Sequence, residues 1–579
     1  MQFAQKFTRL LPALLCLTAI LLAACGNGST PPSTVHATKA SANKQVYIYP
    51  QTTVTDIKTF DPALSTDYNS IVAIDMVFTG LVQLDDNLNV RPQLADSWQV
   101  GPDGLTWTFQ LKPDLKFSDG TPLTSKDVAY SIDRALQPAV KSETAPIYLA
   151  LVKDSDKLLA GKLPTIINDS IRTPDDNTVV IVTNKKAAYF LDALTYSCSY
   201  VVEKSLIDKY GNQNFVDHLS EGGGDGPFKV TSYGHSAQIV FVPNPNYYGP
   251  QPQLQKVIMP FYKEVASAYQ AYQVGQVSAT GTYGFPTTYL PQARQHTAEF
   301  HLSPQLNINY YAMNYLVKPF DNIHIRQAFA LAVNKDAIVH AIWKDLYIPT
   351  NHIVPQGMPG YNPNLTGPDG TKSTSGNSAK ARALFQQGLR EEGWTSVAQM
   401  PPINLTYATG QAETANEVTT IIQMWQSVLG VSVKPDPIDF NRELNEIFTN
   451  KLQFWLIAWI ADYPDPQDWL TLQFDKGVPN NNINYGQNNS SDAAQQQAIQ
   501  KQLEAADVSS DQNARLQQYN QAEQQLVNDV AWMPIEQVRV PNLLKPCVKG
   551  VVFNASGVTP PDDWGNVYIS TDTPCSNPT

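Results

Sequence analysis

A short stretch in the last quarter of the chain combines a carboxylate with aromatic residues in an order that suits the binding of a cation. The stretch reads Trp459-Ile460-Ala461-Asp462-Tyr463-Pro464-Asp465-Pro466-Gln467-Asp468-Trp469. The apolar run before it, residues 454–460, predicts a strand, and the two prolines predict a turn. Asp462 would therefore be a lone carboxylate at the end of an apolar strand, where burial requires a hydrogen-bond donor or a cation as its partner.

A local cap is the simpler interpretation of the same acidic residues. Pro464 and Pro466 have no backbone N–H to donate, and either Asp462 or Asp465 can accept hydrogen bonds from the other N–H groups of a turn. The residues alone leave both interpretations open.

The first residues of the chain predict export. Lys6 and Arg9 precede the apolar run 10–24, which is too short to span a bilayer comfortably and is typical of a secretory signal peptide. The run ends in Leu22-Ala23-Ala24-Cys25-Gly26, which resembles a bacterial lipobox. We expect residues 1–24 to be removed and Cys25 to carry a diacylglyceryl group, which would anchor the protein on the outer side of the cell membrane. An ordinary cleaved signal with an incidental cysteine is the alternative.

Composition then separates a tether from a globular body. Residues 26–45 are mainly small or polar, so that we expect Cys25 to be followed by a flexible tether that ends at residue 45. The remainder of the 579 residues, in a chain with 42% hydrophobic content, predicts a soluble body of two or three domains. A net charge of −12 without any Lys/Arg cluster argues against nucleic acid as a partner.

Cysteine use is sparse. Cys16 lies in the signal and Cys25 would be lipidated, which leaves Cys198, Cys547 and Cys575 in an oxidising compartment. Cys547 and Cys575 are the candidates for a disulfide because both lie in the C-terminal tail. Cys198 would then be a buried free thiol.

Hydrophobic periodicity predicts both strands and helices. Residues 46–49 read as a strand, and residues 70–82 have apolar side chains at helical spacing. Trp107, Phe109 and Leu111 alternate with polar residues, which is the pattern of a half-buried strand.

Further helices follow. Thr124 and Asp127 have the spacing of a capping box at a helix start. Residues 378–394 and the glutamine-rich residues 493–530 have apolar positions three and four apart. We interpret the glutamines as solvated helix surface.

No catalytic or metal motif is legible in the sequence. A nucleophile elbow, a zinc-protease helix, a P-loop and paired metal-binding cysteines are all absent. The glycine-rich loop 222–226 lacks the helix that a phosphate site requires, because Pro227 begins a strand-like run. His296 and His301 are five residues apart and do not share a helix face. We expect no catalytic residues, no metal site and no cofactor.

Several motifs together resemble a known family. Residues 94–98, 104–109 and 116–128, which read LADSW, GLTWTF and KFSDGTPLTSKDV, resemble the signature of the extracellular solute-binding proteins of family 5. These are the peptide-, dipeptide- and nickel-type receptors of ABC importers. The resemblance continues with residues 226–230, 244–248, 325–335 and 530–535.

The resemblance implies an α/β fold of the type II-like periplasmic-binding-protein kind, with two lobes, a hinge and an extra domain, three domains in total. Carried onto this chain, domain I would comprise residues 46–90, 224–306 and 525–579. Domain II would comprise residues 91–223 and domain III residues 307–524.

The resemblance also implies a site. The segment that matches Trp459 to Tyr463 lies in the interdomain cleft of peptide receptors, and its Asp pairs with the terminal ammonium of the peptide. Asp462 is therefore the expected ligand-binding carboxylate, with Trp459, Ile460, Ala461 and Tyr463 beside it. The loop Thr66-Asp67-Tyr68-Asn69 would line the opposite cleft wall, where peptide main chain can pair as an added strand. No residue for the ligand carboxylate carries across.

The expected function is that of a lipid-anchored receptor, monomeric and without enzymatic activity, that binds short peptides and delivers them to ABC transporter permease subunits. The same fold with a nickel chelate, an oligosaccharide or another solute as ligand is the first alternative. A surface sensor or chaperone-like peptide binder without a permease is the second, and a hydrolase is a distant third because no triad is legible.

Overall fold

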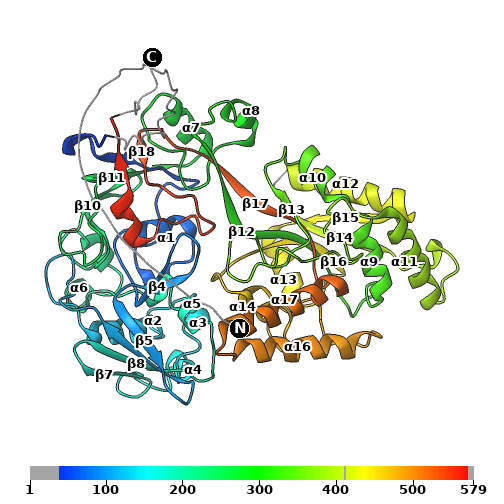
Figure 1. Cartoon of the computed structure of the whole chain (residues 1–579), viewed down its shortest axis with the longest axis horizontal. Coiled ribbons are helices and arrows are strands. Elements are labelled where there is room, and N and C mark those ends of the chain that lie inside the picture. Colours follow the sequence, from blue (N-terminus) through cyan, green and yellow to red (C-terminus); the bar gives the residue numbers. More distant parts are fainter. Residues whose placement is uncertain (1–37, 410–411, 572–579) are drawn as a thin grey trace, which may run out of the picture.

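Two long antiparallel strands join the two halves of the molecule (Figure 1). The structure is a computed structural model that describes residues 38–409 and 412–571. The joining strands are β12 (Phe300–Met313) and β17 (Met533–Leu543). Their pairing shifts register between Pro304 and Ile308, so the ladder is irregular where the chain passes between the halves.

A five-stranded sheet forms part of the first half, with order β1-β11-β10-β9 and β2 paired to β11. β1 and β2 run parallel to β11, whereas β9, β10 and β11 are antiparallel neighbours. Its strands are β1 (Val46–Ile48), β2 (Gln51–Thr52), β9 (Phe228–Gly234), β10 (Gln238–Pro243) and β11 (Lys256–Tyr262). The helices in the same stretches of chain are α1 (Tyr68–Ile74), α7 (Val265–Gln273) and α8 (Leu290–Ala293). The small pairs β3 (Val82–Leu84) with β4 (Val90–Pro92) and β18 (Val548–Lys549) with β19 (Tyr568–Ile569) complete this part.

A four-stranded antiparallel sheet with order β5-β6-β8-β7 occupies the rest of that half. The predicted alternation is confirmed in β6, where Trp107, Phe109 and Leu111 are buried. The predicted capping box is confirmed too, because Oδ2 of Asp127 accepts a hydrogen bond from the backbone N–H of Thr124 at 2.8 Å. The strands are β5 (Ala95–Val100), β6 (Thr106–Leu111), β7 (Ile171–Asp175) and β8 (Thr178–Val182). The helices are α2 (Ser125–Ala135), α3 (Ala145–Tyr148), α4 (Ser155–Leu159), α5 (Phe190–Ala193) and α6 (Lys204–Tyr210).

A mixed six-stranded sheet, β13-β17-β12-β16-β14-β15, forms the second half together with most of the long helices. β16 lies between β12, to which it is antiparallel, and β14, to which it is parallel. The further strands are β13 (Ile348–Pro349), β14 (Ile403–Ala408), β15 (Val433–Ile438) and β16 (Phe454–Ile460). The helices are α9 (Ile323–Leu331), α10 (Lys335–Ala341), α11 (Ser378–Glu391), α12 (Ala412–Leu429), α13 (Phe440–Phe448), α14 (Pro466–Trp469), α15 (Thr471–Phe474), α16 (Ala493–Asp507) and α17 (Gln512–Asp529).

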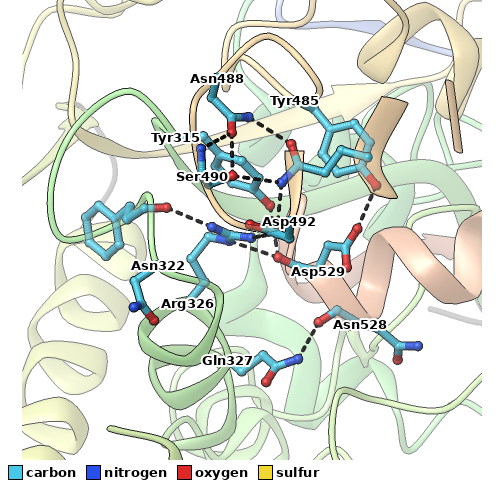
Figure 2. Close-up of polar contacts among 12 residues, drawn as sticks. Tyr315, Asn322, Arg326, Gln327, Tyr485, Asn488, Ser490, Asp492, Asn528 and Asp529 are labelled. Carbon is cyan, nitrogen blue, oxygen red and sulfur yellow. Dashed lines mark hydrogen bonds and ion pairs between the residues drawn. The ribbon is translucent and has the colours of Figure 1, made fainter. Parts of the chain in front are cut away.

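A fully buried arginine ties three of these segments together (Figure 2). Arg326 of α9 pairs with Asp492, just before α16, at 2.6 Å. It also donates to the backbone oxygens of Phe320 and of Asp529, the last residue of α17, and its guanidinium lies 3.7 Å from the ring centre of Tyr315. A planar guanidinium suits this arrangement because it donates in several directions while stacking on an aromatic face. The cluster is structural and lies apart from the site described below.

The helix predicted for residues 70–82 is wrong in its second half. α1 ends at Ile74, and the following backbone makes long-range hydrogen bonds instead. The carbonyls of Met76 and Val77 accept from the N–H groups of Phe228 and Gly226, and the carbonyl of Gly80 accepts from Leu94. These bonds satisfy the backbone, so a helix is not required there.

The tether expected up to residue 45 is wrong at its end, because Ala40 and Gln45 pack on the body. The side chain of Gln45 is buried and donates to the carbonyls of Ala40 and Ile569 at 2.8 and 2.9 Å. The backbone N–H of Ala40 also donates to Ile569. Backbone and amide hydrogen bonds therefore hold a segment that has almost no apolar side chains to bury.

The interpretation of the glutamines as solvated surface is wrong for two of them. Gln496 and Gln500 of α16 are buried. The amide of Gln500 donates to the carbonyls of Phe474 and Tyr485 at 2.8 Å, and Gln496 accepts from the N–H of Gly486. These side chains supply hydrogen-bond partners for backbone groups of a buried, irregular loop. Sequence composition does not reveal such long-range partners.

The structure tests only some of the predictions about the cysteines and about export. Cys198 is a buried free thiol, as predicted. Cys547 is disulfide-bonded, while Cys575 lies outside the described residues, so the Cys547–Cys575 pairing stays a prediction. The signal peptide and Cys25 also lie outside them. No helix in the described ranges combines the length and the apolar character that crossing a membrane requires.

Candidate functional site

The predicted site begins where β16 ends. Ile460 is the last residue of the strand and pairs with Asn307 of β12. Ala461 continues the ladder by one hydrogen bond, from its N–H to the carbonyl of Leu306 at 2.9 Å. The apolar strand is thus confirmed, and Asp462 is held immediately beyond its end.

Asp465 has the capping role that the sequence left open. Its Oδ1 accepts from the backbone N–H of Gln467 at 2.9 Å at the start of α14. Both of its oxygens also pair with the guanidinium of Arg515, at 2.6 and 2.7 Å. Because both side chains are almost fully buried, this bidentate pair compensates the charge of Asp465 and fixes the turn.

Asp462 lacks such compensation. Its side chain is only partly exposed, and no lysine, arginine or histidine of the described residues forms an ion pair with it. Burial raises the pKa of Asp462 to about 6, while a hydrogen bond with Tyr148 acts in the opposite direction. A partly buried carboxylate that ionises near neutral pH is suited to accept a cationic group.

Asp462 is nevertheless not the lone carboxylate that the sequence predicted. The single turn of α14 brings back Asp468, which is fully buried. Oδ2 of Asp468 accepts from the indole Nε1 of Trp459 at 3.0 Å and from the backbone N–H of Asp462 at 3.3 Å. Its Oδ1 has no hydrogen-bond partner within residues 38–409 and 412–571. Burial, followed by the charge of Asp462, raises the pKa of Asp468 well above its usual range.

Aromatic residues from the first half of the molecule face this turn. Tyr463 is buried and stacks parallel to Tyr189, with ring centres 6.0 Å apart. Tyr148, the last residue of α3, meets Tyr463 edge-on at 6.2 Å and stacks on Tyr196 at 3.7 Å. Asp462 therefore lies where the two halves of the molecule come together.

The strand residues beside Asp462 differ in exposure. Trp459 and Ala461 are partly buried, whereas Ile460 is 64% exposed. Trp459 and Ile460 also border a cavity of about 240 Å³, here called the apolar pocket, which lies among α13, β16 and residues 480–483.

Of the second predicted group, Thr66, Asp67 and Tyr68, only Tyr68 lines a cavity, and this cavity is separate from the apolar pocket. Tyr68 is the first residue of α1 rather than part of a loop, because Oδ1 of Asp67 caps the helix through the N–H of Ser70. Thr66 accepts a hydrogen bond from Lys58. The backbone is therefore extended only as far as Asp67, and a peptide added as a strand could not pair beyond that residue.

The Tyr68 side chain lines a small cavity of about 60 Å³. Its hydroxyl donates to the carbonyl of Gly557 at 2.6 Å. Asp75 also lines this cavity, with an unpartnered Oδ1 and a pKa that burial raises to about 7. No residue of the stretch 459–469, which includes Asp462, lines this cavity.

Sequence reasoning missed Asp468, Tyr148 and Asp75. Asp468 had a signal, since Asp-Pro-x-Asp predicts a capped helical turn that returns the second carboxylate toward the strand end. Tyr148 and Asp75 had none, because their partners lie far away in the chain. Among the described residues, no group of three or more His, Cys, Asp and Glu side chains is arranged to hold a metal ion.

Comparison with known proteins places this geometry in a family. The model of the bacterial extracellular solute-binding proteins, family 5, matches residues 89–482. The oligopeptide-binding protein OppA of Bacillus subtilis is 25% identical over 555 residues, which are 94% of this chain and 96% of that protein. The dipeptide-binding protein DppE of the same organism is 26% identical over 533 residues, 90% of this chain and 91% of that protein.

Solved structures show the same fold. The unliganded open form of the periplasmic murein tripeptide-binding protein MppA superimposes with a TM-score of 0.77 at 23% identity, covering 92% of this chain and 99% of that one. Haemophilus influenzae OppA in complex with the peptide RPPGFSPFR gives a TM-score of 0.62 at 22% identity, covering 91% and 99%. The expected α/β, multidomain, type II-like fold is confirmed. This chain belongs to the bacterial extracellular solute-binding proteins of family 5.

Proposed function

We propose that the protein is a receptor that binds short peptides between its two halves and delivers them to the permease of an ABC transporter. The observation that carries the proposal is the Asp462 carboxylate, which is partly buried, has no cationic partner among the described residues and lies at the contact between the halves. The names of similar proteins, an oligopeptide-binding and a dipeptide-binding protein, support the choice of peptides.

In this proposal Asp462 pairs with the terminal ammonium of the peptide. The bond is charge-assisted and strengthens as the halves close and exclude water. Trp459 lies beside it with its indole held by Asp468. An aromatic face near an ammonium adds attraction through its quadrupole.

The closing motion takes place at β12 and β17. We propose the domain division 46–90, 224–306 and 525–579 for domain I, 91–223 for domain II and 307–524 for domain III. The irregular register of β12 against β17 between Pro304 and Ile308 then lies near the boundary between domains I and III. Tyr148 and Tyr196 would approach the ligand from domain II, and Asp462 and Trp459 from domain III.

Attachment to the membrane completes the proposal. A diacylglyceryl group on Cys25 would keep the receptor next to the permease. Metabolic labelling with a radioactive or clickable fatty acid tests this. Labelling of the natural chain and its loss in Cys25→Ala is the expected result.

The ligand is tested first by native mass spectrometry of the purified protein, followed by gentle denaturation. A ladder of peptide masses is expected, whereas a single non-peptide mass or a nickel complex would contradict the peptide assignment. Calorimetric titration then compares a tripeptide that has a free amino terminus with its N-acetylated form. Binding of the first and loss of the second is expected.

Asp462→Ala tests the residue itself. Removing one partner of a desolvated charge pair costs about 2–5 kcal/mol, so affinity falls about 30-fold or more. Asp96→Ala is the matched control, because Asp96 is an exposed carboxylate of β5 away from the site. Equal affinities of the two variants, with normal folding, would refute the role of Asp462.

A further inference from the structure

The apolar pocket next to Trp459 has a mainly apolar lining. α13 contributes Phe440, Leu444, Ile447 and Phe448, which recur at three- and four-residue spacing and so share one helix face. β16 contributes residues 455 and 457–460, and residues 480, 482 and 483 close the side. The pocket is therefore an opening between a helix and the sheet that the chain's own side chains leave unfilled.

Rigid aromatic rings form part of the wall. Tyr310 of β12 and Trp532 stack with ring centres 3.7 Å apart and an angle of 12° between the planes. Both are buried. Such a stacked pair has little freedom to move, so it does not collapse into the cavity.

Large apolar side chains are left in water around the pocket. Phe440 is 50% exposed, Phe448 53% and Ile460 64%. Exposed apolar side chains are ordinary when scattered, but three that border one cavity mark a surface that gains from being covered.

The pocket excludes charge. No Asp, Glu, Lys, Arg or His of the described residues lines it, and its amide side chains are those of Gln473, Asn480 and Asn482. A carboxylate or ammonium placed inside would be desolvated without an ionic partner. The pocket therefore suits an uncharged, apolar group.

The pocket lies close along the chain to the proposed ammonium site. Trp459 and Ile460 line it, and Asp462 follows two residues later, at most about 7 Å along the backbone. The indole of Trp459 is fixed by its hydrogen bond to Asp468, so it separates the charged turn from the pocket at a constant position. If the terminal ammonium of a peptide binds Asp462, a side chain from one of its first few residues can therefore reach the pocket.

The volume of the apolar pocket limits how much of a ligand it can hold. Pockets that enclose a whole small molecule usually measure about 300–1,000 Å³. At about 240 Å³, this one is suited to a single side chain. We infer that the apolar pocket is a specificity subsite, which takes a large aliphatic or aromatic side chain from one of the first three residues of a peptide whose amino terminus is bound at Asp462. The inference rests on the proposed peptide-receptor function.

The experiment is a calorimetric titration of the full protein with uncapped tripeptides. Ala-Ala-Ala is the reference, and Phe, Leu, Glu or Lys replaces each alanine in turn. Burying one large apolar side chain corresponds to about a 10- to 100-fold gain in affinity. We expect that gain for Phe and Leu at one position, and weaker binding than the reference for Glu and Lys at the same position.

Variants assign the gain to the pocket. Phe448→Asp puts a charge at the pocket, and its side chain is exposed enough for the fold to tolerate the change. We expect the affinity ratio of the preferred Phe peptide to Ala-Ala-Ala to fall to near one. Leu316→Asp is the matched control, because Leu316 is 54% exposed and does not line the pocket, so the ratio should not change. Phe440→Ala is a second, milder variant and should lower the ratio partway.

The outcomes separate this inference from the proposed function. If Ala-Ala-Ala binds and is lost in Asp462→Ala, but Phe and Leu give no gain at any position, only the subsite is refuted. If the gain persists in Phe448→Asp, the side chain binds elsewhere and the subsite is again refuted. If no free-amine peptide binds, the proposed function fails and this inference with it. A dimer that becomes a monomer in Phe448→Asp would assign the pocket to a second copy of the chain and overturn the inference.

Discussion

The Asp468 carboxylate and the Trp459 indole are joined by a hydrogen bond of 3.0 Å, from Nε1 to Oδ2, inside the turn that follows β16. Burial, followed by the charge of Asp462, raises the pKa of Asp468 well above its usual range. The bond orients the indole beside Asp462.

This relationship predicts different effects for two substitutions. Asp468→Asn keeps an oxygen that can accept from the indole, so peptide affinity at pH 7 should change less than about threefold. Asp468→Ala leaves the indole N–H without an acceptor, which costs about 1–3 kcal/mol and frees the ring. Its affinity should fall about tenfold. Calorimetry measures both, and equal losses in the two variants would mean that the charge of Asp468 matters.

Peptide binding should weaken in acid. Asp462 pairs with an ammonium only when it is ionised, and burial raises its pKa to about 6. Affinity should change little between pH 6.5 and 7 and should fall below pH 6, approaching tenfold per pH unit. Titrations between pH 4.5 and 7 test this, because the amino terminus of a peptide, with a pKa of about 7.7–8, stays mostly protonated over that range. Affinity that is unchanged down to pH 4.5 would show that the ligand is held by another group.

Asp462→Asn should stabilise the empty protein while it weakens binding. Because burial raises the pKa of Asp462, the ionised form is disfavoured in the folded state above pH 6, and this penalty disappears as the pH falls toward 4. A shift from the ordinary value of 3.8 to about 6 corresponds to about 3 kcal/mol at pH 7.5. Urea denaturation at pH 7.5 and at pH 4.5 should show a gain at the first pH and little at the second. A loss of stability at pH 7.5 would indicate that the carboxylate has a stabilising partner.

Arg515 should matter to stability far more than an exposed arginine. Arg515→Ala leaves Asp465 buried and unpaired, which costs about 3–5 kcal/mol. Arg442→Ala is the control, because Arg442 is 62% exposed and pairs with Glu446 one helical turn away, an interaction worth about 0.3–0.5 kcal/mol. Denaturation midpoints compare the two. Similar midpoints would mean that the Asp465–Arg515 pair contributes no more than a surface pair.

Local sequence was sufficient for the elements whose partners are adjacent in the chain. The alternation of Trp107, Phe109 and Leu111 predicted β6, and Thr124 with Asp127 predicted the start of α2. The apolar run before Asp462 predicted β16, and the order of motifs predicted the family. These features follow from a period of two or 3.6 residues, or from a cap three residues long, and need no knowledge of the rest of the chain.

Sequence failed where distant segments supply the hydrogen bonds. Residues 76–80 have helical spacing, but α1 ends at Ile74. The carbonyls of Met76 and Val77 accept hydrogen bonds from the N–H groups of Phe228 and Gly226 instead. Gln500 is a polar residue of a type usually found on the surface, yet it is buried. Its amide donates hydrogen bonds to the carbonyls of Phe474 and Tyr485 there. A polar group is buried whenever its partners are present, and those partners cannot be read from its neighbours in sequence.

The candidate site also has features that local sequence predicts and features that depend on distant segments. By itself the sequence determined that an acidic residue, Asp462, follows an apolar strand among aromatic residues. Only the tertiary structure decided that Asp468 returns to hold Trp459, that Tyr148 faces Tyr463 from the other half, and that α13 leaves an apolar pocket beside the strand. The physical reason is that pKa shifts, cavities and ring contacts depend on burial, and burial is fixed by how elements hundreds of residues apart pack together.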